Sequence, residues 1–168
     1  MVKHKNRVYH AHANANENKE ERWRMFKFVV DDKVVLKLLD TIHADRLFEL
    51  QDADRPYLRE WLPWVDGTKS VEDTKSFIEG TKKQFASNNG FQAGIWYQGN
   101  MAGVIGFHGM NWANHSTSIG YWLGEKYRGR GVMTKSCKAF VEYTFRELNI
   151  NRVEIRCAEK NLRSRANS

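Results

Sequence analysis

A short glycine-rich segment lies between a predicted strand and a predicted helix, and its residue types suit it to bind an anion. The segment is Tyr127-Arg128-Gly129-Arg130-Gly131-Val132-Met133-Thr134. Two glycines let the backbone approach a ligand without an intervening Cβ. The N–H groups in the first turn of a helix, together with the helix dipole, favour negative charge. Arg128 and Arg130 add positive charge, so the turn is predicted to bind a pyrophosphate.

The elements on either side of the turn position it. Residues 115–123 end in an apolar run, which predicts a strand. Residues 132–148 keep a helical period of apolar side chains, and residues 152–158 alternate as a strand. Two strands joined through a helix make a right-handed parallel crossover. Ligands favour the carboxyl end of a strand at such a place, which supports the predicted anion site.

The earlier strands predict the other part of the sheet. Residues 26–30 and 34–38 form a predicted β-hairpin. Strands 91–97 and 101–107 are joined at a predicted turn, Gly99-Asn100. The fold class is therefore α/β, of the α+β type: one mixed sheet with antiparallel N-terminal strands and a parallel crossover.

Two further helices are predicted before those strands. Thr41 is expected to cap a helix that ends before Pro56. The aromatic segment 57–65 follows, and it either packs on the core or lines a pocket. Ser70 and Asp73 match a capping box that opens the second helix. The face of that helix expected to be buried consists of Phe77, Ile78, Thr81 and Phe85.

Composition bounds the class of protein. The chain has 168 residues, 41% of them hydrophobic, and a net charge of +7, which fits one globular domain. No apolar run approaches the ~20 residues of a membrane span, and two cysteines favour a reduced, cytoplasmic setting. Residues 1–24 are polar and aperiodic, so we expect a disordered extension before a domain at 25–168. Nucleic-acid binding would rest on charge alone and is disfavoured.

Several motifs in order resemble the Gcn5-related N-acetyltransferase (GNAT) superfamily. The Arg128 to Met133 turn is similar to its acetyl-CoA loop, with Met133 in place of a small residue. The RimJ/RimL-like branch, which acetylates ribosomal proteins, is the most similar. The segments that carry this second resemblance are 59–65, Glu72-Asp73-Thr74 with Phe77-Ile78, Gly120-Tyr121-Trp122-Leu123 and Asn161-Leu162-Arg163-Ser164.

The resemblance implies an acetyl-CoA site. The strand edge Trp122-Leu123-Gly124 would pair with the pantetheine amides, as an added strand would. The N–H groups of Arg128, Gly129, Arg130, Gly131, Val132 and Met133 would hold the pyrophosphate, helped by Thr134. Asn161 would contact the pantetheine arm. Ser164 would protonate the departing thiolate, although a serine near a helix start often serves only the backbone.

The resemblance also implies that the final helix of the fold is incomplete and that its last two strands are missing. In the family these elements complete the sheet and wall part of the acceptor site. We therefore expect a chain that binds CoA better than it catalyses. A catalytically weak CoA-binding or assembly module is the corresponding alternative.

The implied reaction is attack by a neutral amine on the acetyl thioester. The amide near Leu123 is the expected oxyanion donor. The residues that could accept the amine proton are His108, Glu125 and Tyr121, and each also has a structural interpretation: a strand end, a solvated charge and a core residue.

The acceptor is the least defined part of the reaction. An α-amino group, with a pKa near 7.7–8.0, is more easily neutral than lysine near 10.4. A site without an obvious base therefore favours a protein N-terminus, as the branch suggests. A small antibiotic amine or polyamine stays open as acceptor, and so does a homodimer as the assembly.

Overall fold

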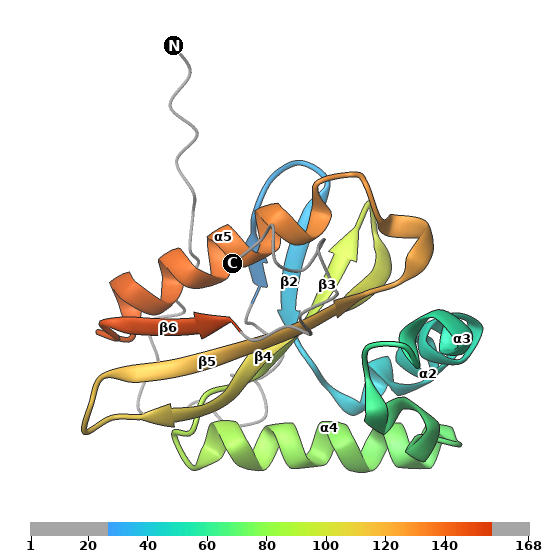
Figure 1. The fold of residues 1–168 in the computed structure, drawn as a ribbon, viewed down its shortest axis with the longest axis horizontal. Coiled ribbons are helices and arrows are strands. Elements are labelled where there is room, and N and C mark those ends of the chain that lie inside the picture. The colour runs from blue at the N-terminus through green and yellow to red at the C-terminus, as the bar shows by residue number, and fades with distance from the viewer. Residues whose placement is uncertain (1–26, 156–168) are drawn as a thin grey trace.

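The sheet that the sequence predicts is present in the computed structural model, which describes residues 27–155 (Figure 1). Six strands are hydrogen-bonded in the order β1-β2-β3-β4-β5-β6. Their bounds are β1 Lys27–Val29, β2 Val34–Leu38, β3 Gln92–Tyr97, β4 Asn100–Asn111, β5 Ser116–Leu123 and β6 Arg152–Ile155. All neighbouring pairs are antiparallel except β5 and β6, which are parallel. The predicted mixed sheet with a parallel crossover is confirmed.

Helices cover both faces of this sheet. In Figure 1, α5 lies on one face, and α4 lies on the other with α2 and α3 beside it. The α-helices are α2 Ala44–Ala53, α3 Arg55–Leu58, α4 Val71–Ala86 and α5 Val132–Glu147. Three 3-10 turns join them to the rest of the chain: η1 Thr41–His43, η2 Pro63–Gly67 and η3 Glu125–Tyr127. None of the helices within residues 27–155 is long and apolar enough to cross a membrane.

The predicted turn between the central strands is displaced by one residue. Gln98 and Gly99 form it, with φ of 48° and 81°, and Asn100 already pairs with Tyr97. Two consecutive residues with positive φ make the tight hairpin turn that matches the twist of the flanking strands.

The start of the first helix also differs from the prediction. Asp40, not Thr41, is the N-cap, and a 3-10 turn precedes α2. The backbone N–H of Asp40 donates to Nδ1 of His43 at 3.0 Å, so a histidine fills the place that Glu or Gln usually takes in a capping box. The helix ends at Ala53, and Pro56 lies in the first turn of α3, where its missing N–H costs nothing.

Helix α4 begins as predicted, but only half of the residues expected on its buried face are buried. The capping box is confirmed. Ser70 Oγ accepts from the N–H of Asp73 at 3.2 Å, and the Asp73 carboxylate accepts from the N–H of Ser70 at 3.0 Å. Phe77 and Phe85, however, are 46% and 37% exposed. Ile78 and Thr81 are buried as predicted, and Thr74 is buried with them. Threonine can be buried here because its hydroxyl bonds a carbonyl of the preceding turn, as Thr81 does to Ile78 at 2.8 Å.

An aromatic cluster joins α5 to the centre of the sheet. Phe107 of β4 is fully buried, with its ring centroid 5.1 Å from that of Phe91 and 4.6 Å from that of Phe140. Met133, Cys137 and Phe140 of α5 are buried, as the helical period predicts. This packing fixes α5, and therefore the turn that precedes it, against β4.

The predictions made for residues 1–24, for Asn161 and Ser164, and for the closing helix and strands lie outside the described residues.

Candidate active site

The carboxyl half of β5 has a ladder partner on one side only among the described residues. β6 pairs with Ser116 to Ile119, and the last pair is Ile119 with Ile155. β4 pairs with the whole of β5, up to Leu123 opposite Gly103. Backbone groups of residues 120–123 that point away from β4 are therefore placed to hydrogen-bond an extended ligand, as an added strand would.

Leu123 presents its amide to this edge. The N–H of Gly124 donates to the carbonyl of Ala102 in β4 at 2.8 Å. Successive amides of a strand point to opposite sides, so the N–H of Leu123 points away from β4 and that of Trp122 points toward it. Of the predicted edge residues Trp122, Leu123 and Gly124, only Leu123 can offer an N–H to a ligand there.

The glycine-rich turn follows and leads into α5. Gly129 and Gly131 both have φ of 71°, a conformation that glycine adopts without strain. Gly131 is the N-cap of α5 and brings no side chain to the first-turn N–H groups. A Cβ built on Gly129 would have no atom within 4 Å, so the surface above the turn is open. This is the geometry of an anion-binding helix start.

Met133, which departs from the family pattern, does not obstruct the turn. Its side chain is 8% exposed, and that of Val132 is 1% exposed, because both pack into the core. Only the backbone N–H groups of these two residues can therefore face a ligand. Thr134 is exposed in the same turn.

The two arginines of the turn are held by neighbours. The Arg128 guanidinium lies 4.5 Å from the centroid of the Tyr57 ring and 3.5 Å from the Glu125 carboxylate. Arg130 Nε donates to the carbonyl of Lys126 at 3.1 Å. Stacking and hydrogen bonding reduce the conformational freedom of both side chains, so their charge is placed beside the turn before a ligand arrives.

His108 is the candidate base that lies exposed beside the unpaired part of β5. It occupies a β-bulge, because the register passes from Phe107 opposite Ile119 to Gly109 opposite Ser118. A Cβ at Gly120 would be 2.4 Å from His108 Nε2, so the imidazole packs directly on the Gly120 backbone. It also borders an open groove of about 360 Å³, whose lining includes Ser118 and Glu154.

The other two candidate bases are already engaged. The Tyr121 hydroxyl hydrogen-bonds the buried thiol of Cys137, and burial raises the pKa of that thiol to about 12. The Glu125 carboxylate faces Arg128, and the Glu125 N–H donates to Asp54 Oδ2 at 2.7 Å. The Tyr121 hydroxyl is thus held by the core, whereas the Glu125 carboxylate is 60% exposed and its pair with Arg128 is a surface one.

Part of the aromatic segment 57–65 lies against the end of β5. We use the term aromatic loop for residues 61–68, which include the second half of that segment and the three residues after it. Within it, Trp64 is 48% exposed and meets Trp122 edge-on, with ring centroids 6.5 Å apart. Val65 is fully buried beside it. The aromatic loop therefore both packs on the core and exposes an aromatic wall next to the residue that precedes Leu123.

Sequence reasoning missed Asp54 and Arg55, and it named Tyr57 only as part of the aromatic segment 57–65. Asp54 accepts from the N–H of Glu125 just before the turn, and the Tyr57 ring stacks on Arg128 in the turn. Arg55 contacts the aromatic loop. Their partners are 10 to 71 positions away in the chain. No spacing rule could have found them.

An ion pair ties the first turn of α5 to the β1–β2 turn, and it predicts a pH dependence of stability. Lys135 Nζ lies 2.7 Å from Asp31 Oδ2. Burial raises the pKa of Asp31, but hydrogen bonds from Lys135, Lys33 and Val34 together outweigh that effect and leave the pKa below its usual value. A carboxylate with a lowered folded pKa adds stability above its unfolded pKa and loses it as pH falls through the folded pKa.

Asp31→Asn should therefore lower the free energy of unfolding at neutral pH. The difference from the parent should shrink as pH falls from about 5 to about 3. Urea unfolding at several pH values measures it. An equal loss at every pH would show that the Asp31 charge does not matter.

Within residues 27–155 the geometry fits an acyl-CoA thioester: an open strand edge for an amide-bearing arm, then a glycine turn and helix start for a pyrophosphate. Comparison with known proteins agrees. Residues 33–167 match the family described as Acetyltransferase (GNAT) domain. "Putative ribosomal N-acetyltransferase YdaF" of Bacillus subtilis (strain 168) is 34% identical over 143 residues, 84% of this chain and 78% of that protein.

Two solved structures extend the comparison. One is RimL, the ribosomal L7/L12 α-N-protein acetyltransferase, solved with coenzyme A. It has a TM-score of 0.81 at 28% identity, and the match covers 84% of this chain and 80% of the RimL chain. The microcin C7 self-immunity acetyltransferase MccE, with acetyl-CoA and AMP, has a TM-score of 0.78 at 28% identity, covering 83% and 78%. The chain belongs to the GNAT acetyltransferases, and it transfers an acetyl group from acetyl-CoA to an amine.

Proposed function

We propose that this acetyltransferase acetylates the N-terminal α-amine of a ribosomal protein. The observation that carries the proposal is the Leu123 edge, open beside an anion-binding turn and flanked by an aromatic wall. The names of YdaF and RimL support the class of acceptor. The proposed catalytic domain is 25–168, and the family match at 33–167 supports it. The proposed location is the cytoplasm, where ribosomal proteins are made.

The proposed acetyl-CoA site combines the strand edge and the turn. The backbone of β5 at Trp122 to Gly124, through the Leu123 carbonyl, pairs with the pantetheine arm, which leaves the Leu123 N–H for the acetyl carbonyl. The N–H groups of residues 129–133 bind the pyrophosphate, and Thr134 adds its hydroxyl. The N–H of Arg128, also expected there, already donates to the Glu125 carbonyl at 3.1 Å, so Arg128 contributes its guanidinium. By resemblance, Asn161 contacts the pantetheine arm and Ser164 lies near the thiol.

The chemistry follows from this placement. The acetyl thioester supplies an activated carbonyl, and a neutral amine attacks it. The C–N bond forms, the C–S bond breaks, and the Leu123 N–H stabilises the charge that develops on the carbonyl oxygen. Ser164 passes a proton to the thiolate and regains one from water. The proton lost by the amine passes to water or to His108, the exposed base beside β5.

The acceptor preference rests on acidity. At neutral pH the pKa gap of ~2.5 units between an α-amine and lysine is worth ~3.4 kcal/mol in forming the neutral nucleophile. Of the candidate bases, Tyr121 and Glu125 already have hydrogen-bond or ion-pair partners. Such a site reacts faster with an amine that is already largely neutral, because less proton removal is needed. The exposed face of Trp64, beside Trp122, is the proposed contact for the first residue of the acceptor.

The test is CoA release with two matched peptides. One begins with free Ser or Ala and has its lysines blocked; the other has a formylated N-terminus and one free lysine. We expect the first to react roughly 10²-fold faster at neutral pH, as the pKa gap predicts. Equal rates, or a faster lysine peptide, would contradict the proposal.

A second candidate acceptor is a small antibiotic amine. Its support is the similarity to MccE, which is named as a self-immunity acetyltransferase for microcin C7. The same CoA-release assay with a panel of amine-bearing antibiotics decides between the two. A kcat/KM for any of these amines above that of the best N-terminal peptide would replace the ribosomal acceptor.

A further inference from the structure

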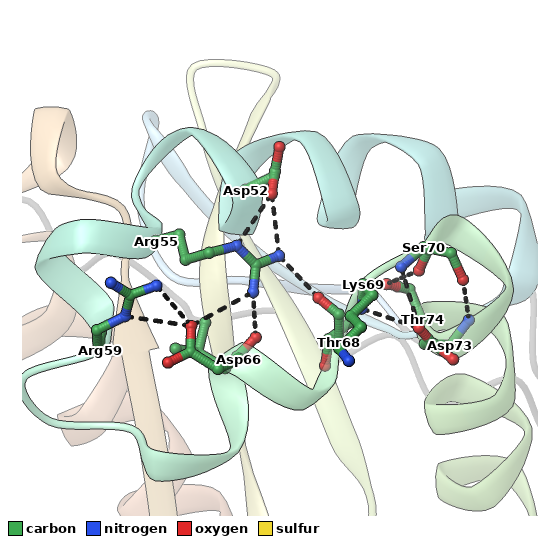
Figure 2. A network of polar contacts seen from close by, with 10 residues as sticks. Asp52, Arg55, Arg59, Asp66, Thr68, Lys69, Ser70, Asp73 and Thr74 are labelled. Carbon is green, nitrogen blue, oxygen red and sulfur yellow. Dashed lines mark hydrogen bonds and ion pairs between the residues drawn. The ribbon is translucent and has the colours of Figure 1, made fainter.

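The corner between α2 and α3 carries an arginine that reaches into the aromatic loop. Arg55 Nη1 donates to the carbonyl of Val65, and Nη2 donates to the carbonyl of Thr68 at 2.7 Å (Figure 2). Asp52 accepts from Nε and Nη2 at 3.0 and 2.9 Å. The Arg55 side chain is only 18% exposed. One guanidinium thus bonds two loop carbonyls and is itself oriented by a carboxylate.

These bonds act where the aromatic loop meets the strand end. Val65, whose carbonyl Arg55 bonds, directly follows Trp64, whose ring meets that of Trp122. The ion pair of Arg59 with Asp66, at 2.9 Å, is exposed on both sides and contributes little, as surface pairs do. Arg55 and the buried Val65 therefore fix the place of Trp64 relative to β5.

The corner between α2 and α3 also contacts the segment between β5 and α5, which carries the glycine-rich turn. Asp54 Oδ2 accepts from the N–H of Glu125, and the Tyr57 ring stacks under Arg128. A Cβ at Gly124 would lie 2.9 Å from Asp54 Oδ2 and 2.7 Å from Leu50 Cδ1, so the chain passes very close to the corner there. Figure 1 shows the segment between β5 and α5 running beside α3.

We propose that residues 54–57 form a positioning unit that couples the acetyl-CoA turn to the aromatic loop, with Arg55 as the residue that positions the loop for the acceptor. A ligand that orders the turn at Arg128 also orders Tyr57 and the corner, and through Arg55 it orders the loop. The role in acceptor binding rests on the proposed function. The coupling between turn and loop does not.

Arginine is needed for the geometry. Its planar fork serves three oxygens in different directions at once, whereas a lysine ammonium is a compact charge on a flexible stem. Arg55→Lys keeps the charge and removes the fork. Arg59→Ala is the matched control, because Arg59 lies four residues away and contacts the same loop only at the exposed carboxylate of Asp66.

Two measurements test the proposal on the full chain. The first is hydrogen exchange of segment 61–68 with and without CoA, which reports local opening. In the parent and in Arg59→Ala, CoA should slow exchange there; in Arg55→Lys, CoA should still bind with affinity within about twofold of the parent, but without slowing exchange in that segment. The second is the KM for an N-terminal peptide, which should rise about tenfold in Arg55→Lys.

The outcomes separate the two claims. Equal slowing of exchange in the parent and in Arg55→Lys overturns the coupling, even if the variant melts at a lower temperature. No slowing in the parent overturns it too. If exchange behaves as expected but no peptide is acetylated by the parent, the coupling stands and the proposed acceptor fails. Tyr57→Leu cuts the other end of the unit, and it should also abolish the effect of CoA on segment 61–68.

Discussion

Replacing Gly131 by valine is expected to weaken CoA binding at least tenfold, about 1.4 kcal/mol. Gly131 has φ of 71° at the N-cap of α5, where a β-branched residue is a strong outlier. The backbone must leave this conformation or accept roughly 1–2 kcal/mol of strain. Either response moves the N–H groups of Val132 and Met133, or covers them with methyl groups. Titration calorimetry with CoA measures the loss.

Gly99→Val is the matched control for Gly131→Val. Gly99 has φ of 81° and an open Cβ position, but it lies in the β3–β4 turn. The strain is similar, so stability should fall in both variants, while CoA affinity in Gly99→Val should stay within about twofold of the parent. Unchanged affinity in Gly131→Val, or equal weakening in both variants, would remove the turn from the CoA site.

Phe107→Ala should cost about 3–5 kcal/mol of the free energy of unfolding. The ring is fully buried, contacts Phe91 and Phe140, and joins β4 to α5. Its removal leaves a cavity under the helix that carries the anion turn. Urea unfolding measures the loss, and an unchanged m-value would show that the variant still folds cooperatively.

Phe77→Ala gives the contrast on α4. Phe77 is 46% exposed, so its loss should change stability by no more than about 0.5 kcal/mol. The sequence pattern alone assigns Phe77 to the buried face and would predict a loss nearly as large as that at Phe107. A cost of several kcal/mol at Phe77 would contradict the packing described for α4.

The features that the sequence predicted well are encoded locally. The Ser70–Asp73 capping box, the hairpin of β1 and β2, and the succession of β5, turn and α5 each depend on residues within a few positions of one another. Local hydrogen bonds and the period of apolar residues specify such features.

The errors in the helices arose where a polar side chain finds its hydrogen-bond partner within its own helix or turn. Hydrophobicity favoured Phe77 and Phe85 over Thr74 as buried residues of α4. The hydroxyls of Thr74 and Thr81 bond carbonyls of their own helix, which removes most of the cost of burying them. His43 likewise serves Asp40 in a capping arrangement that no common motif describes.

The contacts of the α2–α3 corner were beyond prediction for another reason. The bond from Arg55 to Thr68 and the bond from Glu125 to Asp54 join a side chain to a distant backbone group. Nearly every residue carries the same backbone N–H and C=O groups, so the sequence does not show which backbone group a side chain will bond. The nearby motif 59–65 indicated that the region matters, but not what holds it in place.

The most direct test of the proposed function uses ribosomal proteins with free N-termini as a mixture of acceptors. The purified chain is incubated with them and isotope-labelled acetyl-CoA, and tandem mass spectrometry locates the label. We expect labelled N-terminal residues on one or a few of these proteins, with lysines unlabelled and with labelling at subsaturating acetyl-CoA reduced in Gly131→Val. Label spread over lysine side chains, or no label at any N-terminus, would contradict it.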